Sequence, residues 1–107
     1  MPTRGHVPVA VRRAERTMGE NLRNQRKLLG LTATMVAERA DVSPGTLRNI
    51  EHGEPVRSEA LLKVLRVLGM LDAVVAATDP YRTDVGVLRA NEQLPQRVRV
   101  PREGDGR

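Results

Sequence analysis

The residues able to do covalent or metal chemistry are few in this chain of 107 residues. It contains no cysteine, and its two histidines, His6 and His52, lie far apart in the sequence. Without thiolates or further nearby ligands they do not predict a metal site. Ser43 and Ser58 each precede a helical pattern, where a serine is explained by capping. We therefore predict no enzyme activity, no metal and no cofactor.

A different chemistry, hydrogen bonding to nucleic acid, suits the basic and amide side chains. Arginine and asparagine side chains can match the major-groove edges of guanine and adenine respectively. All but Lys27 and Lys63 of the 18 basic residues are arginine, and 13 acidic residues leave a net charge of +5. This surplus indicates a polyanionic partner. With 1% aromatic residues, stacking on single strands is not expected.

A long first helix is predicted from about Ala10 to Leu29, with Gly30 as its end. Spacings of four, three and four place one set of side chains on an inward face: Met18, Leu22, Gln25 and Leu29. Another face carries a basic stripe, which could bind phosphate or simply be solvated: Arg16, Arg23, Arg26 and Lys27.

Two short helices separated by a tight turn follow. Thr32 is a good N-cap for the first of them, which would turn Val36, Ala37 and Ala40 inward. Ser43 caps the second, with Pro44 at its first position, and Leu47 and Ile50 would hold it to the body until Gly53. Such a pair is a recurring DNA-reading unit whose second helix enters the major groove.

The rest of the chain also reads as helical. A helix capped by Ser58 has its apolar residues at the strongest helical spacing in the chain and ends at Gly69. Residues 70–77 form a short, almost wholly apolar helix that Asp79 and Pro80 break. A sixth helix would run from Thr83 to Leu94, with Pro95 as its stop. Valine alternations at residues 7–11 and 98–100 predict at most edge strands or extended arms.

Residues 18–70 resemble the Xre, or lambda-repressor-like, helix-turn-helix family. The resemblance is carried by Leu22-Arg23, Gly30-Leu31-Thr32, Ala37-Glu38-Arg39-Ala40, Val42-Ser43 and Ile50-Glu51-His52-Gly53. It implies an all-α, lambda-repressor-like DNA-binding domain of five to six helices with a C-terminal helical extension. Ala33 and Asp41 depart from the family, which often has glutamine and glycine at these positions.

The resemblance also implies which residues contact DNA. Relatives often read bases with the first two positions of the recognition helix, which are Pro44 and Gly45 here. Because these two residues lack polar side chains, most of the base readout is expected from Thr46, Arg48 and Asn49. The phosphate contacts that it implies are Ser43, Thr32, Arg23, Lys27 and Arg57. Alternatively, Arg48 and Arg57 are ordinary surface arginines, and Ser43 and Thr46 belong to the start of the helix. His52 has a structural alternative, because the helix dipole favours a cation at the C-terminal end of a helix.

Four regions are expected: a flexible basic arm (1–9), the DNA-binding domain (10–69, with the helix-turn-helix at about 32–53), a helical extension (70–95) and a basic tail (96–107). The extension offers apolar residues for a homodimer or another partner: Met70, Leu71, Val74 and Val75. Dimerisation would suit two half-sites one DNA turn apart. Alternatively, residues 81–94 cover this helix within the monomer.

The extension resembles that of small Xre-type regulators paired with HipA-type kinases, on the stretches Thr83–Gly86 and Leu94–Arg99. This implies a HipB-like antitoxin that binds a HipA-type kinase and represses its own operon. We therefore expect a cytoplasmic, nucleoid-associated transcriptional repressor that binds double-stranded DNA. It would bind a palindromic operator as a homodimer. The alternatives are a protein-interaction module that mainly neutralises a toxin kinase, and a helical bundle without a nucleic-acid role. Neither a membrane segment nor a secretory signal is expected.

Overall fold

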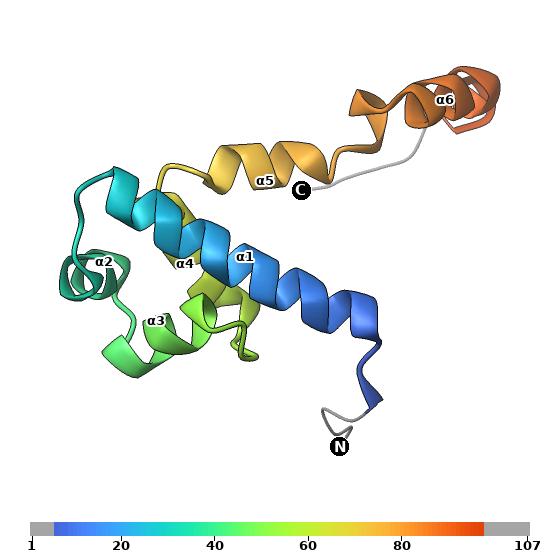
Figure 1. The fold of residues 1–107 in the computed structure, drawn as a ribbon. Helices are drawn as coiled ribbons and strands as arrows, with labels where there is room; N and C mark the ends of the chain where they lie inside the picture. Colours follow the sequence, from blue (N-terminus) through green and yellow to red (C-terminus); the bar gives the residue numbers. More distant parts are fainter. Residues whose placement is uncertain (1–5, 98–107) are drawn as a thin grey trace. The chain divides into compact units, whose positions relative to one another are not determined.

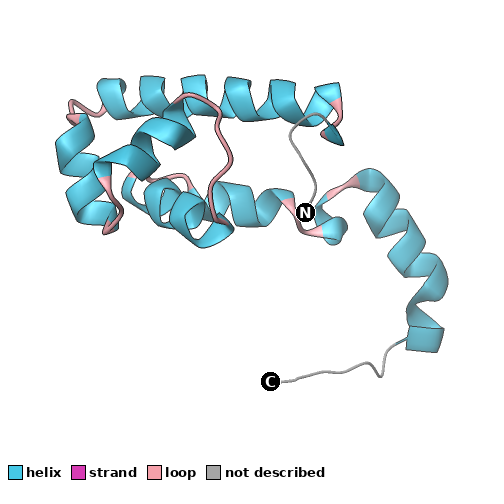
Figure 2. Ribbon diagram, turned by 90° about the horizontal axis from the view of Figure 1, so that it is seen from below, coloured by secondary structure: helices cyan, strands magenta, loops and turns pink. Residues whose placement is uncertain are grey.

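The computed structural model describes residues 6–97, and every regular element in that range is helical. The expectation of an all-α fold is confirmed, and Figure 2 shows helices joined by short loops. Val9 and Val11 lie in the first helix instead of an edge strand, while Val98 and Val100 lie outside the described residues. The elements are α1 (Val9–Leu28), α2 (Ala33–Ala40), α3 (Pro44–Glu51), α4 (Ser58–Val67), α5 (Leu71–Ala77), the 3-10 helix η2 (Pro80–Arg82) and α6 (Asp84–Arg97).

The chain divides into two compact units, with the boundary between Asp72 and Ala73. The first unit holds α1 to α4, and the second holds η2 and α6, while the boundary falls within α5. Residues 1–5 of the expected N-terminal arm and residues 98–107 of the expected basic tail lie outside the described residues. Positions 6–8 precede α1, and positions 96 and 97 belong to α6.

The core of the first unit is built from aliphatic side chains of four helices. α2 contributes Val36, Ala37 and Ala40, and α3 contributes Leu47 and Ile50, all buried as predicted. α2 packs on α4, and α1 packs on α3, as Figure 1 illustrates for the long blue helix. The remaining buried apolar side chains are Leu22, Val64, Leu65 and Leu68. No polar side chain is fully buried among the described residues, so the interior of this core is apolar.

The predicted starts of α2 and α3 are confirmed by side-chain caps. The Thr32 hydroxyl accepts from the Met35 backbone N–H at 3.1 Å, and the Ser43 hydroxyl accepts from the Thr46 backbone N–H at 3.0 Å. The expected cap at Ser58 is wrong. Arg57 takes the N-cap position without a side-chain hydrogen bond, and Ser58 is already the first helical residue.

The turn between α2 and α3 contains a backbone feature of its own. Asp41 has a φ of 57° and a ψ of 49°, which is the left-handed helical conformation. Its backbone N–H bonds to Glu38 O, and the Val42 N–H bonds to Ala37 O, so the left-handed residue closes the end of α2. Among the described residues it is the one non-glycine with a positive φ.

The expected inward face of α1 is only partly correct. Leu22 is buried, but Met18 and Leu29 are 39% and 49% exposed. Gln25 is half-buried and donates from Nε2 to the Leu68 carbonyl at 3.1 Å, which ties α1 to the end of α4. Gly19 approaches α3 closely, because a Cβ added there would lie 2.5 Å from the Ile50 carbonyl oxygen. A glycine therefore sets the spacing of this crossing.

The second unit is held by local hydrogen bonds. Asp79 caps η2 through the Tyr81 N–H at 2.9 Å, and Thr83 caps α6 through the Gly86 N–H at 2.9 Å, as predicted for Thr83. Pro95 does not stop α6, which continues to Arg97. A proline removes one backbone donor, and so close to a helix end only one bond of the last turn is lost.

Candidate nucleic-acid interface

The second helix of the helix-turn-helix, α3, is anchored by one face and open on the other. Leu47 and Ile50 are 2% and 4% exposed, and they hold the helix to the core. At 100° per residue the opposite face consists of Gly45, Arg48, Asn49 and His52. Of these, Arg48, Asn49 and His52 are exposed and Gly45 is half-buried. Two polar side chains that match base edges thus project from a fixed helix.

The first turn of α3 is occupied by its own capping bonds. Ser43 Oγ accepts from the Thr46 N–H and donates to Thr46 Oγ1 at 2.9 Å. Thr46 is half-buried on the side of the helix nearer Ile50, while Pro44 is exposed. The two hydroxyls are therefore partnered in the free protein, and base contacts by Thr46, Pro44 and Gly45 stay predictions.

A nearly buried ion pair ties α3 to α1. Arg26 donates from Nε to Glu51 Oε2 at 2.7 Å and from Nη2 to Glu51 Oε1 at 3.2 Å, and the two side chains are 12% and 10% exposed. Its Nη1 also donates to the Leu31 carbonyl at 3.1 Å. The hydrogen bond to Glu51 raises the pKa of Arg26 above its usual value. Arg26 therefore ties the two helices together, and the prediction that it belongs to a basic stripe open to phosphate or solvent is wrong.

Three of the predicted DNA contacts, Arg23, Pro44 and Arg48, meet in one open hollow of about 360 Å³. Arg23 from α1 and Arg48 from α3 both line it, together with Ala33 and Thr34 at the start of α2. Thr32, the α2 cap, and Lys27 and Arg57, both exposed, are not among its lining residues. The hollow thus brings a predicted phosphate ligand and a predicted base reader onto the same side of the helix pair.

His52 is a further lining residue that the sequence interpretation left out of the interface. It is the C-cap of α3, as expected for its position, and it is exposed. It also lines the hollow with Arg48, four residues earlier on the same face. That four-residue spacing was the signal available in the sequence.

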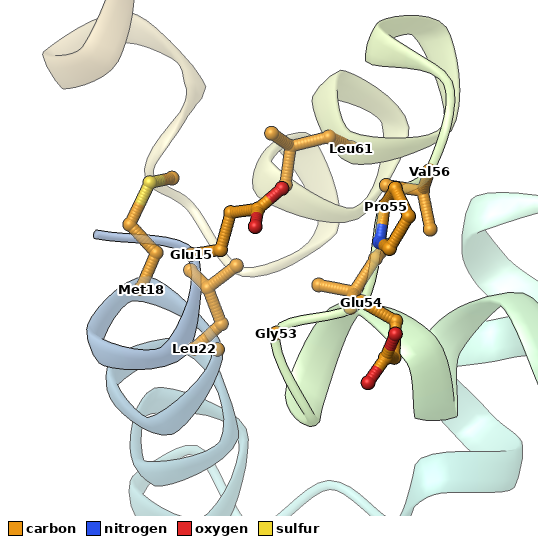
Figure 3. A pocket seen from close by; sticks show the side chains of 10 residues that line it. Glu15, Met18, Leu22, Gly53, Glu54, Pro55, Val56 and Leu61 are labelled. Atoms are coloured by element: carbon orange, nitrogen blue, oxygen red, sulfur yellow. The ribbon is translucent and has the colours of Figure 1, made fainter. Parts of the chain in front are cut away.

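A second cavity, of about 160 Å³, lies between α1, the loop after α3 and the start of α4. Figure 3 shows Met18 and Leu22 on one side, Leu61 on another, and Pro55 and Val56 across from them. The cavity explains why Met18 is partly exposed, because the helices do not close over it. Its lining includes none of the predicted DNA contacts.

The residues expected to form a dimer or partner surface lie on both sides of the boundary between the units. Met70 and Leu71 belong to the first unit and are half-buried, whereas Val74 and Val75 belong to the second. Val74 is half-buried and Val75 is 57% exposed.

Among the residues that the structure describes, no cluster of three acidic or histidine side chains could hold a metal ion. None of the described helices combines the length and the apolar character that spanning a membrane requires.

Comparison with known proteins agrees with this geometry. A family model described as a helix-turn-helix domain matches residues 17–78, more than half of the chain. The match spans α2, the turn and α3, and extends through α5. No curated protein sequence and no solved structure gave a significant match.

Proposed function

The chain belongs to the helix-turn-helix domain family, and on that premise we propose that it is a sequence-specific transcriptional regulator of double-stranded DNA. α3 enters the major groove, where Arg48 and Asn49 read base edges. Arg23, Lys27, Arg57 and the N-terminal ends of α2 and α3 contact the phosphates that position it.

The observation that carries this proposal is the exposure of Arg48 and Asn49 on a helix that is fixed from behind. Leu47 and Ile50 hold α3 to the core, and Glu51 is clamped to Arg26 of α1. A recognition helix held from two sides keeps its readers in place before DNA arrives, so less entropy is lost on binding. One good bidentate contact is worth about 1–3 kcal/mol of discrimination between bases.

The proposal is tested by selecting bound duplexes from a random library with the full chain and measuring affinity for the selected and unselected sequences. Replacing Arg48 and Asn49 together by alanine should lower the ratio of the two affinities by about tenfold or more. The matched control is Arg82→Ala with Asn91→Ala, two exposed residues of the same types in the second unit. An unchanged ratio in the Arg48/Asn49 variant would contradict the assignment of the readers.

The proposed operator is palindromic and is bound by a homodimer that represses its own gene. Two recognition helices about 34 Å apart fit two half-sites one turn of DNA apart. The apolar residues of α5, with Val75 exposed, supply the dimer surface. Val75→Glu should convert the dimer to a monomer in sedimentation and remove the preference for paired half-sites. A wild-type chain that stays monomeric on DNA would contradict this arrangement.

A second candidate function, neutralising a HipA-type kinase, is favoured by the exposed apolar side chains of α6. Val85, Val87 and Leu88 are 66%, 42% and 58% exposed on a helix that begins at Asp84. Such residues suit a protein contact. Co-expression with a kinase encoded beside the gene should give a complex that Leu88→Glu weakens. A kinase that does not co-purify with the wild-type chain would remove this candidate and leave the DNA-binding proposal intact.

A further inference from the structure

The N-terminal part of α1 lies outside the helix-turn-helix match. α1 begins at Val9, whereas the match begins at residue 17, so the helix is longer by about two turns. These turns carry Arg12, Arg13 and Arg16. We call the segment Val9–Arg16 the α1 extension. Its place in the fold determines whether its arginines can take part in binding.

The α1 extension is packed directly against the end of α3. Gly53, which follows α3, is buried and has a φ of 77°. An added Cβ there would lie 2.9 Å from the Arg16 Cα, closer than side chains tolerate. The glycine therefore lets the backbone of α1 reach the C-terminal end of the recognition helix. The backbone of Arg16 is thus held beside the end of α3, and Arg16 and His52 line the same hollow.

An open hollow of about 450 Å³ runs along this junction. Its basic lining residues come from two elements: Arg13, Arg16 and Arg23 from α1, and His52 from the end of α3. It shares Arg23, Glu51 and His52 with the hollow that contains Arg48. The two hollows are therefore neighbours along α1, and together they form what we call the basic groove.

The charge of the basic groove favours an anion. Glu51 is already bonded to Arg26, which leaves Glu20 as the other carboxylate in the lining. Among the described residues, no ion pair or side-chain hydrogen bond engages the three lining arginines of α1. Three guanidinium charges exceed one carboxylate plus the roughly half negative charge at the C-terminus of α3.

We propose that Arg13 and Arg16 bind phosphates of the DNA backbone beside the bases read by α3. This inference rests on the proposed function and adds a contact outside the family match. Arg13 and Arg23 are separated by about 15 Å along α1 at 1.5 Å per residue. That length corresponds to the rise of about four nucleotides at 3.4 Å each. The α1 extension thus lengthens the path along which the protein follows one strand.

The test measures the salt dependence of DNA binding by fluorescence anisotropy, with the full chain and a labelled 30-base-pair duplex of random sequence. The slope of log affinity against log salt is negative, and each lost phosphate contact reduces its magnitude by about 0.9. Arg13→Ala with Arg16→Ala should therefore reduce the slope by about 1.8 per protomer. Between 50 and 200 mM salt the advantage of the wild type over this variant should shrink by about 12-fold.

The matched control is Arg39→Ala with Arg66→Ala, which removes the same charge from exposed residues that line neither hollow. Its slope should stay at the wild-type value, and circular dichroism should show that both variants remain folded. Equal slopes for the two variants would overturn the inference while wild-type binding still supports the proposed function. If the wild type does not bind the duplex even at low salt, both the inference and the proposed function fail.

Discussion

The two units of this chain are stabilised in different ways. In the first unit, some contacts join residues far apart in the sequence, such as the Arg26–Glu51 ion pair and the bond from Gln25 to the Leu68 carbonyl. In the second unit, the described side-chain hydrogen bonds join residues two or three positions apart. No described side chain from Ala73 onward is buried. The first unit thus has a tertiary core, whereas the second has well-capped helices whose apolar side chains stay accessible.

The largest expected difference in the free energy of unfolding is between the same leucine-to-alanine substitution in the first and in the second unit. Leu47→Ala should lower the free energy of unfolding by about 2–5 kcal/mol, because it leaves a cavity in the core. Leu88→Ala, at a residue that is 58% exposed, should change it by no more than about 0.5 kcal/mol. Urea unfolding of both variants measures the difference. If Leu88→Ala costs as much as Leu47→Ala, then α6 is covered in solution and the contrast between the units fails.

The ion pair between α1 and α3 should show the next largest effect. Glu51→Ala leaves the Arg26 guanidinium nearly buried without its partner, at a cost of about 3 kcal/mol. Replacing both residues by leucine should cost less than Glu51→Ala alone, since no unpaired charge remains. Exposed Glu54→Ala serves as the control, with a change within about 0.5 kcal/mol. If the double variant is at least as unstable as Glu51→Ala, the unpaired charge of Arg26 is not the cause of the lost stability.

Two glycines of the first unit differ in how closely they are packed, and alanine substitutions at them should have opposite effects on stability. Gly19→Ala places a Cβ 2.5 Å from the Ile50 carbonyl oxygen and should cost about 1–3 kcal/mol. Gly45→Ala has no atom nearer than 3.9 Å and should gain about 0.5–1 kcal/mol from helix propensity. Thermal unfolding of the two variants should therefore shift in opposite directions. If Gly19→Ala does not lower the unfolding temperature, α1 and α3 are not in close contact at Gly19.

The smallest expected effect compares a helix cap in each unit. Ser43→Ala should lower the free energy of unfolding by about 1 kcal/mol, since the cap belongs to a helix of the core. Thr83→Ala removes an equivalent cap in the second unit, but it should leave the unfolding of the first unit unchanged. Amide hydrogen exchange should instead speed up at Gly86. A change in global unfolding with Thr83→Ala would indicate that the two units unfold together.

The elements and the core of the helix-turn-helix were predictable because local patterns determine them. Thr32 and Ser43 cap the two helices, and the apolar residues between them recur at helical spacing. The ion pair was not predictable, because Arg26 shares its basic face with exposed cations and its partner is remote in the sequence. Gly19 did carry a signal, since an isolated glycine inside a helical pattern often marks close packing. Whether Arg48 and Asn49 read bases depends on DNA, which sequence periodicity does not describe.

The left-handed Asp41 that closes α2 has a consequence for the evolution of the chain. An aspartate at a φ of 57° is strained by its Cβ, whereas a glycine adopts this conformation without steric cost. The codons GAU and GAC for aspartate differ from the glycine codons GGU and GGC by one base. A variant with a relaxed turn is thus a single point mutation away, and it would leave every side chain of the recognition helix unchanged.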